Sequence, residues 1–426
     1  MSKKKWIAIC LLAVLLVTLL PVPGHAAQTQ NGVTWKINGM TLTVSGEGWI
    51  TSTLAAGWSK YHKGIEKVVI QPGIEGMCDS VFEGCTSLKS VSLPDSMTAI
   101  PHDAFRNCIS LTEVDLPENL QAIGSNAFAG CRKLQQIQLP DSLESLGTGV
   151  FRGSGLTSVT LPDNITTIGE CLFAGCTKLQ EVTFSPYTTE IGYNAFDGCT
   201  KLSEVTLPDT LRRIRSDAFQ NCTSLEAVHF SDLSKWLQMS FGSNHFPSHT
   251  KLYINGQQLT HLVIPEDIQQ VPGFAFEGCA GLVSVTIPSH VTLVRLFAFA
   301  NCKDLTHVYI TNSLTVLSGF EQIPNLQQVE FDGSLNDLRK YTVTDTTILE
   351  AEWTFTPNGW KKTGQEALIY AFEWYQVNHW KMALLVLVLL LIPVTVAIWI
   401  VEDDYKMRKK MAEAQQKIAQ WEKNPE

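Results

Sequence analysis

Cysteine is the residue type whose spacing in this chain first suggests chemistry. Of the eleven cysteines among 426 residues, none forms the C-x-x-C pair of common zinc sites, so no structural zinc ion is expected. Because equivalent positions of a repeat point the same way, we expect a column of buried free thiols that pack as small apolar groups. Disulfide pairing between adjacent turns is the alternative. Eight cysteines share one position of a 23-residue period, with Ser154 there in one repeat: Cys85, Cys108, Cys131, Cys176, Cys199, Cys222, Cys279 and Cys302.

The other residues that could do chemistry form no recognisable catalytic or metal site. Cys78 and Cys171 lie out of phase with the column, and each could be a free surface thiol. His229 and His307 fall at equivalent outward strand positions, where they either join a binding surface or are isolated and solvated. No Gly-rich phosphate loop, G-x-S-x-G elbow or H-E-x-x-H helix is present. The sequence therefore predicts a protein that is not an enzyme and holds no metal or cofactor.

The charge of the chain argues against nucleic acid as a partner. The formal net charge is −9, and residues 27–380 contain 22 basic and 35 acidic residues. Sequence-independent binding of nucleic acid needs a basic footprint, which this acidic body lacks.

The elements that must position these residues are short repeats. In one unit Leu111, Val114 and Leu116 alternate with polar residues, as in a strand with one buried face. Pro117 then turns the chain because it cannot donate to a strand ladder. Ile123 returns to the interior, and Phe128 packs there from a short helical or irregular turn. A single unit cannot bury its apolar side alone, but stacked copies form a continuous core. The fold class predicted for residues 65–335 is a repeat solenoid, a curved rod with one parallel sheet.

The pattern L-x-x-V-x-L-P followed by I-x-x-x-A-F-x-x-C resembles the BspA-type leucine-rich repeats of bacterial surface proteins. The resemblance covers roughly residues 33–335. It implies a leucine-rich-repeat solenoid and interaction at a surface, since members of that family are associated with adhesion to host proteins or other cells. It identifies no particular ligand.

Two hairpin signals interrupt or precede the repeats. Asn38-Gly39 and Asn255-Gly256 stand between alternating apolar residues, a strong signal for a tight β-turn. The first predicts an N-terminal β-hairpin cap within residues 27–64, which would cover the open end of the stack. The second predicts a hairpin that bulges from the rod within an insert at residues 231–262.

Candidate ligand-binding residues are those that the strands would point outwards, together with aromatic residues of the insert. The outward positions predict a polar and mildly acidic sheet surface, although a simply solvated sheet is the alternative for each residue. In the insert, Trp236 and Tyr253 either anchor an interface or form the small core that holds the insert to the rod. The outward candidates are Glu113, Asp115, Gln136, Gln138, Glu181, Glu204, His229 and His307.

The two ends of the chain predict export and membrane anchoring. Residues 1–26 combine a lysine-rich start, an apolar stretch and small residues before a cleavage site near Ala26, as in a secretory signal peptide. Residues 382–401 are apolar and uncharged over the length of a transmembrane helix. They separate a stalk and juxtamembrane helix (336–381) from a basic tail (402–426), which places the C-terminus in the cytoplasm and the solenoid outside the plasma membrane.

The function predicted from these features is a cell-surface binding protein, an adhesin or ligand-capture protein that recognises an extracellular protein or glycan. The alternative is a membrane-tethered scaffold that organises partner proteins through its juxtamembrane helix and tail.

Overall fold

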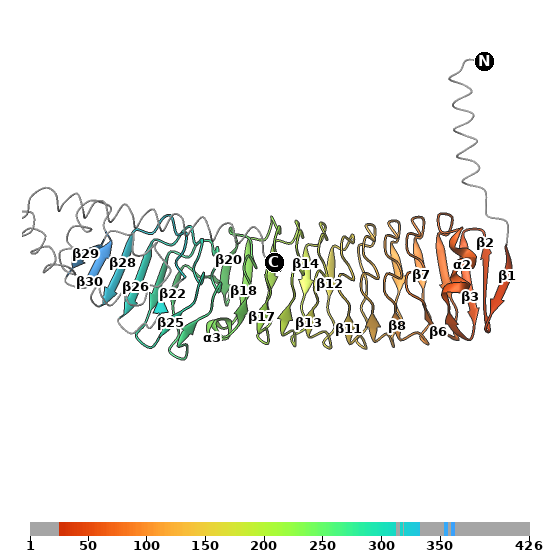
Figure 1. The fold of residues 1–426 in the computed structure, drawn as a ribbon, viewed down its shortest axis with the longest axis horizontal. Helices are drawn as coiled ribbons and strands as arrows, with labels where there is room; N and C mark the ends of the chain where they lie inside the picture. Colours follow the sequence, from red (N-terminus) through yellow and green to blue (C-terminus); the bar gives the residue numbers. More distant parts are fainter. Residues whose placement is uncertain (1–24, 312–315, 318, 333–352, 357–358, 363–426) are drawn as a thin grey trace, which may run out of the picture. The chain divides into compact units, whose positions relative to one another are not determined.

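Each repeat forms one turn of chain, called a coil here, and the coils stack in sequence order as a β-solenoid (Figure 1). The structure is a computed structural model that describes residues 25–311, 316–317, 319–332, 353–356 and 359–362. Apart from Trp353 and Thr354, these residues belong to one compact unit, to which the following description refers.

Both predicted ends lie largely outside the described residues. Of the predicted signal peptide, only His25 and Ala26 are described, and they begin strand β1 (His25–Gln30). Of the predicted stalk, only β29 (Trp353–Thr356) and β30 (Gly359–Lys362) are described, and the predicted transmembrane helix and tail are not. In the described part of the chain, no helix has both the length and the apolar character needed to cross a membrane.

The L-x-x-V-x-L stretches form a first strand line, in which strands pair in parallel with their equivalents in the next coil except after β9, β14 and β20. In β7 (Ser90–Ser92) and β9 (Glu113–Asp115), for example, Val91 aligns with Val114. Side chains on either side of this central residue point outwards, as strand alternation requires. The other strands of this line are β5 (Lys67–Ile70), β12 (Ser158–Thr160), β14 (Glu181–Thr183), β16 (Glu204–Thr206), β18 (Ala227–Phe230), β20 (Lys251–Ile254), β22 (His261–Val263), β24 (Ser284–Ile287), β26 (His307–Thr311) and β28 (Gln328–Asp332).

A second parallel strand line follows the turn at the recurring proline (Pro117 in the unit described above). The prediction of one parallel sheet is therefore wrong. Proline ends the first strand because it lacks a backbone N–H, and the chain then pairs again for two residues around the returning isoleucine. In β8 (Ala99–Ile100) and β10 (Ala122–Ile123), Ile100 aligns with Ile123. The rest of this line is β4 (Gly48–Ile50), β6 (Ile74–Met77), β11 (Ser145–Leu146), β13 (Thr167–Ile168), β15 (Glu190–Ile191), β17 (Arg213–Ile214), β19 (Ser240–Phe241), β23 (Gln270–Val271), β25 (Leu293–Val294) and β27 (Val316–Leu317).

A column of stacked phenylalanine rings runs through the core. Phe105 and Phe128 are fully buried, and their ring centroids lie 5.4 Å apart with the planes 9° from parallel. Each ring covers the next as a new coil is added, so the column extends the hydrophobic core without a gap from coil to coil. Its members up to the insert are Phe82, Phe105, Phe128, Phe151, Phe173, Phe196 and Phe219, and it continues beyond the insert with Phe276, Phe299 and Phe320.

The predicted column of buried thiols is confirmed, and its hydrogen bonds explain why cysteine suits the position. The Cys108 thiol donates to the Phe82 carbonyl oxygen of the preceding coil at 3.1 Å, and Cys131 donates to Phe105 at 3.2 Å. The Phe82 and Phe105 carbonyls already accept the backbone N–H groups of Cys85 and Cys108, so the small side chain with its weak donor adds a second hydrogen bond, from the next coil, to each of them. At the exceptional repeat, the Ser154 hydroxyl lies 3.3 Å from the Cys176 sulfur. The thiols are free, and Cys78 and Cys171 are half-buried rather than fully exposed.

Thiol labelling at pH 8 is expected to separate these two groups of cysteines. Burial raises the pKa of Cys176 to about 11 and that of Cys279 to about 12, and only the thiolate reacts. Burial also raises the pKa of Cys78 and Cys171, but these two side chains are only half-buried. In the native protein, iodoacetamide should therefore modify them slowly and leave the fully buried column untouched. After denaturation without reductant, mass spectrometry should find all eight column cysteines alkylated. Column cysteines that stay unlabelled until reduction would show disulfides instead.

The predicted N-terminal hairpin is confirmed. β2 (Val33–Asn38) and β3 (Thr41–Gly46) pair antiparallel around Asn38 and Gly39, and β3 pairs in parallel with the first coil. Gly39 has φ +60°, a conformation that glycine adopts without strain. The cap also contains a helix that the sequence did not predict, α2 (Ser52–Ser59), whose Trp58 stacks on Phe82 and closes the phenylalanine column.

The insert forms a coil of the stack, so the prediction that it bulges from the rod is wrong. β19 pairs in parallel with β17, and β20 pairs in parallel with β18, which places insert residues in both strand lines. The short helix α3 (Leu233–Leu237) lies between β18 and β19. The hairpin signal at Asn255-Gly256 is confirmed as the turn between β20 and β21 (Gln257–Gln258), which pair antiparallel.

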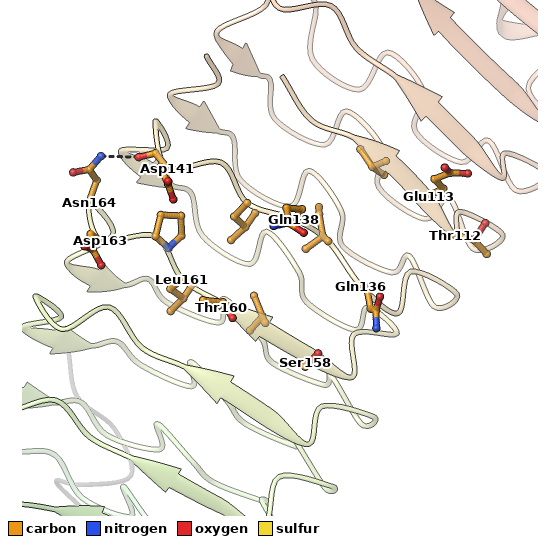
Figure 2. A pocket seen from close by; sticks show the side chains of 15 residues that line it. Thr112, Glu113, Gln136, Gln138, Asp141, Ser158, Thr160, Leu161, Asp163 and Asn164 are labelled. Carbon is orange, nitrogen blue, oxygen red and sulfur yellow. Dashed lines mark hydrogen bonds between the residues drawn. The ribbon is translucent and has the colours of Figure 1, made fainter. Parts of the chain in front are cut away.

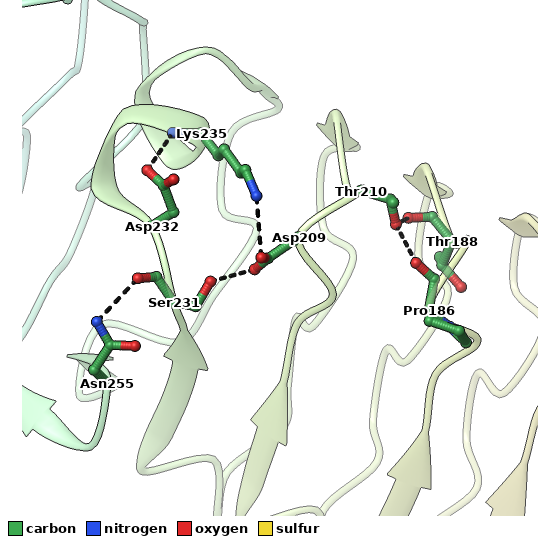
Figure 3. A network of polar contacts seen from close by, with 8 residues as sticks. All are labelled: Pro186, Thr188, Asp209, Thr210, Ser231, Asp232, Lys235 and Asn255. Carbon is green, nitrogen blue, oxygen red and sulfur yellow. Dashed lines mark hydrogen bonds and ion pairs between the residues drawn. The ribbon is translucent and has the colours of Figure 1, made fainter.

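A polar network ties this insert to the preceding coil (Figure 3). The Ser231 hydroxyl donates to the Asp209 carboxylate, and the Lys235 ammonium lies 3.0 Å from the same group. These two contacts, the hydroxyl bond first, hold the pKa of Asp209 below its ordinary value. Asn255 Nδ2 donates to the Ser231 carbonyl at 3.1 Å, so the network spans both ends of the insert.

Candidate functional site

The outward side chains of the first strand line form one continuous surface, called the strand face here. The parallel registers align Glu113 with Ser90, and Glu181 with Ser158, so equivalent residues of successive coils lie side by side. All eight outward candidates predicted from the sequence lie on strands or strand equivalents and have exposed or half-buried side chains. The sequence pattern thus placed this surface correctly, but it did not show where the surface is hollowed.

A groove of about 880 Å³ opens on the strand face between β9 and β12. Its floor is the segment 136–139, and Figure 2 shows Gln136 and Gln138 between Glu113 on one side and Ser158 and Thr160 on the other. Three predicted candidates, Glu113, Gln136 and Gln138, therefore meet in one concave site. Asp115 extends from the same strand but does not line it. The remaining groove residues include Asp141, Leu161, Pro162, Asp163 and Asn164.

The groove lies where the parallel sheet of the first strand line is interrupted. The six-stranded sheet that begins at the cap ends at β9, and pairing resumes with β12 and β14. Segment 136–139 has no strand assignment and makes no backbone hydrogen bond to a neighbouring coil. As a result Val114 and Ile137, whose equivalents elsewhere are buried, are half-buried, and apolar side chains become accessible from the groove.

The interruption adjoins a short repeat. The unit that starts at Ser154 has 22 residues, and the residue is missing from the turn before its strand, where Ser-Gly-Leu replaces Cys-x-x-Leu. Gly155 there donates its N–H to the Cys131 carbonyl at 3.0 Å. A Cβ atom on Gly155 would lie 2.2 Å from the Arg132 oxygen, so only glycine fits. The 22-residue spacing was the sequence signal that marked the groove.

A second group of candidates clusters farther along the strand face. His229 Nε2 lies 3.7 Å from a Glu204 carboxylate oxygen, and the His229 ring stacks on Tyr253 with centroids 4.9 Å apart. The parallel pairing of β16, β18 and β20 brings these residues together. Three residues that the sequence placed only by repeat phase or by insert composition thus form one polar and aromatic patch.

Trp236 belongs to the core, so its placement among ligand-binding candidates is corrected. Its side chain is 1% exposed and lies against Phe230 with ring centroids 4.5 Å apart. The indole N–H donates to the Ala275 carbonyl at 3.2 Å. Of the two roles left open by the sequence, Trp236 therefore has the structural one. It bridges the phenylalanine column where the insert interrupts it.

His307 and Glu181 lie apart from both clusters. The predicted equivalence of His229 and His307 is wrong, because His229 aligns with Thr206, after the central valine of its strand, whereas His307 aligns with Ser284, before it. The His307 Nδ1 atom is 2.7 Å from the Thr306 hydroxyl, and Glu181 is exposed on β14. Across the described ranges, no group of three or more histidine, cysteine or carboxylate side chains is arranged to hold a metal ion.

Comparison with known proteins assigns the family. The model of the BspA type leucine-rich repeat region, with six copies, matches residues 60–176, 144–255 and 248–367. Together these segments cover more than half of the chain. The chain belongs to the BspA-type leucine-rich-repeat family. No curated protein sequence matches it.

Solved structures of other leucine-rich-repeat proteins resemble this BspA-type chain. A leucine-rich repeat protein from Bacteroides ovatus is 21% identical, with 75% of this chain and 80% of that one covered and a TM-score of 0.45. A leucine rich cell surface protein from Faecalibacterium prausnitzii is 22% identical, with coverage of 76% and 99% and a TM-score of 0.36. The pneumococcal vaccine antigen PcpA is 13% identical, with coverage of 75% and 97% and a TM-score of 0.33.

Proposed function

We propose that this BspA-type protein is a cell-surface binding protein whose strand face recognises an extracellular protein or glycan. The observation that carries the proposal is the groove between β9 and β12, the place where predicted outward residues converge on a concave surface. A signal peptide at residues 1–26 and a membrane helix at 382–401, both predicted from the sequence, would hold the solenoid outside the cell.

The chemistry of the groove suits binding rather than catalysis. Its side chains are amides, hydroxyls, carboxylates and aliphatic groups, and no histidine or cysteine is among the residues that line it. The Ser–His and Cys–His pairs that are common in covalent catalysis therefore cannot be assembled from these residues. The same side chains offer many hydrogen-bond donors and acceptors, as a recognition surface requires.

Binding of the full chain to arrays of extracellular-matrix proteins and glycans tests the proposal. The Gln136→Ala, Gln138→Ala double variant is expected to weaken saturable binding about ten- to thirty-fold, since each lost hydrogen bond is worth about 1 kcal/mol. Gln121→Ala with Gln180→Ala is the matched control, because both side chains are exposed and outside the groove. Equal weakening by the two double variants would contradict a role of the groove, and absence of any binding would favour a scaffold acting through the juxtamembrane helix and tail.

A further inference from the structure

We propose that a pocket beside the insert binds an acidic sugar of an extracellular glycan, that is, a pyranose ring that carries a carboxylate. The pocket, called the turn pocket here, has a volume of about 590 Å³, and its lining includes Tyr187, Arg212, Lys235 and Gln238. It lies at the turns between the two strand lines, and it shares no lining residue with the groove. The inference therefore adds a second binding site to the one in the proposed function.

The turn pocket forms because the insert carries a helix where the preceding coil has only a turn. α3 lies between β18 and β19, and the exposed residues Lys235 and Gln238 form one wall. Figure 3 shows Lys235 extending from the helix toward Asp209 of the preceding coil. The helix is held to the core by Trp236, whose indole N–H donates to the Ala275 carbonyl. The wall is thus fixed before a ligand arrives, which lowers the entropic cost of binding.

Tyr187 departs from the repeat at the opposite side of this pocket. In the next coil the equivalent residue, Thr210, donates to the Thr188 carbonyl at 2.9 Å and so joins two coils (Figure 3). In its own coil the Ser185 hydroxyl makes such a bond instead, to the Asp163 carbonyl at 3.0 Å. Tyr187 is therefore left 57% exposed, although the stacking of coils does not require a large aromatic ring there. Elsewhere this position holds a smaller polar residue: Ser96, Asn119, Ser142, Asn164, Thr210, Asp267 and His290.

Arg212 gives the turn pocket a positive charge within an acidic solenoid. It is exposed and forms no ion pair with another described residue, whereas its neighbour Arg213 pairs with Glu190 at 3.2 Å. The other charged groups of the lining, Lys235 and Asp209, lie 3.0 Å apart and compensate each other. One guanidinium is left over, and its planar array of donors matches a carboxylate.

An acidic sugar presents the groups that these side chains recognise. The C–H groups on one face of a pyranose ring are weakly positive, and they pack on the negative face of an aromatic ring such as that of Tyr187. The sugar hydroxyls need both donors and acceptors, which Gln238 and Thr189 offer in the same lining. A glutamate or aspartate side chain of a peptide would satisfy Arg212 but would leave the tyrosine ring uncovered.

Binding of the full chain to an array of uronic-acid and sialic-acid glycans, each beside its carboxylate methyl ester, tests the proposal. At least one acid form is expected to bind about ten-fold or more tightly than its ester, because the ester loses charge-assisted hydrogen bonds. This binding should weaken as the salt concentration rises. Neutral glycans, sulfated glycans and a polyglutamate peptide complete the array. Equal binding of acid and ester, binding confined to these other probes, or no binding would overturn the proposal.

Paired variants of the chain locate the site. Arg212→Gln should weaken binding of the acid form about ten-fold and Tyr187→Ser about five-fold, since each removes one of the two main contacts. Arg213→Gln and Tyr193→Ser are the matched controls, because both positions are exposed and neither lines the turn pocket. The controls should change binding less than about two-fold, because charges outside the site are screened by salt. Losses in the controls as large as those in the variants would rule out the turn pocket as the site.

The outcomes also separate this inference from the proposed function. If a protein or a neutral glycan depends on Gln136 and Gln138 while no acidic glycan binds, the inference fails and the proposed function stands. The same holds if binding of acidic glycans is lost with Gln136→Ala and Gln138→Ala but kept in Arg212→Gln. If acidic glycans bind through Arg212 and no ligand depends on the groove, the turn pocket stands and the groove does not.

Discussion

Replacement of Phe128 by alanine is expected to lower the free energy of unfolding by about 3–5 kcal/mol. The ring is fully buried between Phe105 and Phe151, whose centroids lie 5.4 and 6.0 Å away. Its removal leaves a cavity that the stacked coils cannot close, because backbone hydrogen bonds such as that from Phe128 N to Val150 O at 2.9 Å fix their spacing. Urea denaturation followed by circular dichroism measures the loss.

Phe297→Ala is the matched control for this prediction. Phe297 is 39% exposed and contacts Phe274, with centroids 5.2 Å apart, at the surface. An exposed aromatic pair contributes about 0.5–1.5 kcal/mol, so the control should lose less than half of what Phe128→Ala loses. Similar losses in the two variants would mean that the phenylalanine column does not carry the stability of the stack.

Acidification is expected to destabilise the insert coil through His245. Burial lowers the pKa of His245 to about 4, against about 6.5 in an unfolded chain. The folded state therefore holds this histidine neutral while the unfolded state takes up a proton. The loss of folding stability through His245 is absent above about pH 6.5 and grows as the pH falls. It is about 2 kcal/mol at pH 5 and levels off near pH 4 at about 3 kcal/mol.

His245→Asn tests this dependence, since an amide can still donate to the Gly242 carbonyl that lies 2.9 Å from His245 Nδ1. Denaturation of the variant between pH 7.5 and pH 5 should show a smaller loss of stability than the natural chain shows. His249→Asn, at an exposed position of the same loop, should keep the full loss. A steep pH dependence that survives in His245→Asn would assign the effect to other groups.

The repeat made most of the fold predictable from the sequence. Leu111, Val114 and Phe128 recur in phase because each coil must present the same faces to its neighbours, so one unit predicts the stack. The thiol column followed from the same argument, and the hairpin at Asn38-Gly39 followed from turn chemistry. The second strand line did not follow, because two residues around Ile123 are too few to show the alternation of a strand.

Packing between coils decided what periodicity could not. Trp236 stands among polar residues in the sequence and looks like a surface anchor, yet the insert closes into a coil and buries it. His229, Glu204 and Tyr253 belong to three segments, and only the parallel register brings them together.

The sequence by itself determined the solenoid, its cap and the residues of the strand face, since these depend on patterns repeated within one coil. The tertiary structure alone decided where that face becomes a site. The groove depends on hydrogen bonds that are not made between neighbouring coils around residues 136–139. Whether two coils pair is a property of their mutual placement, to which a one-residue shortening at Gly155 contributes, and no single repeat contains that information.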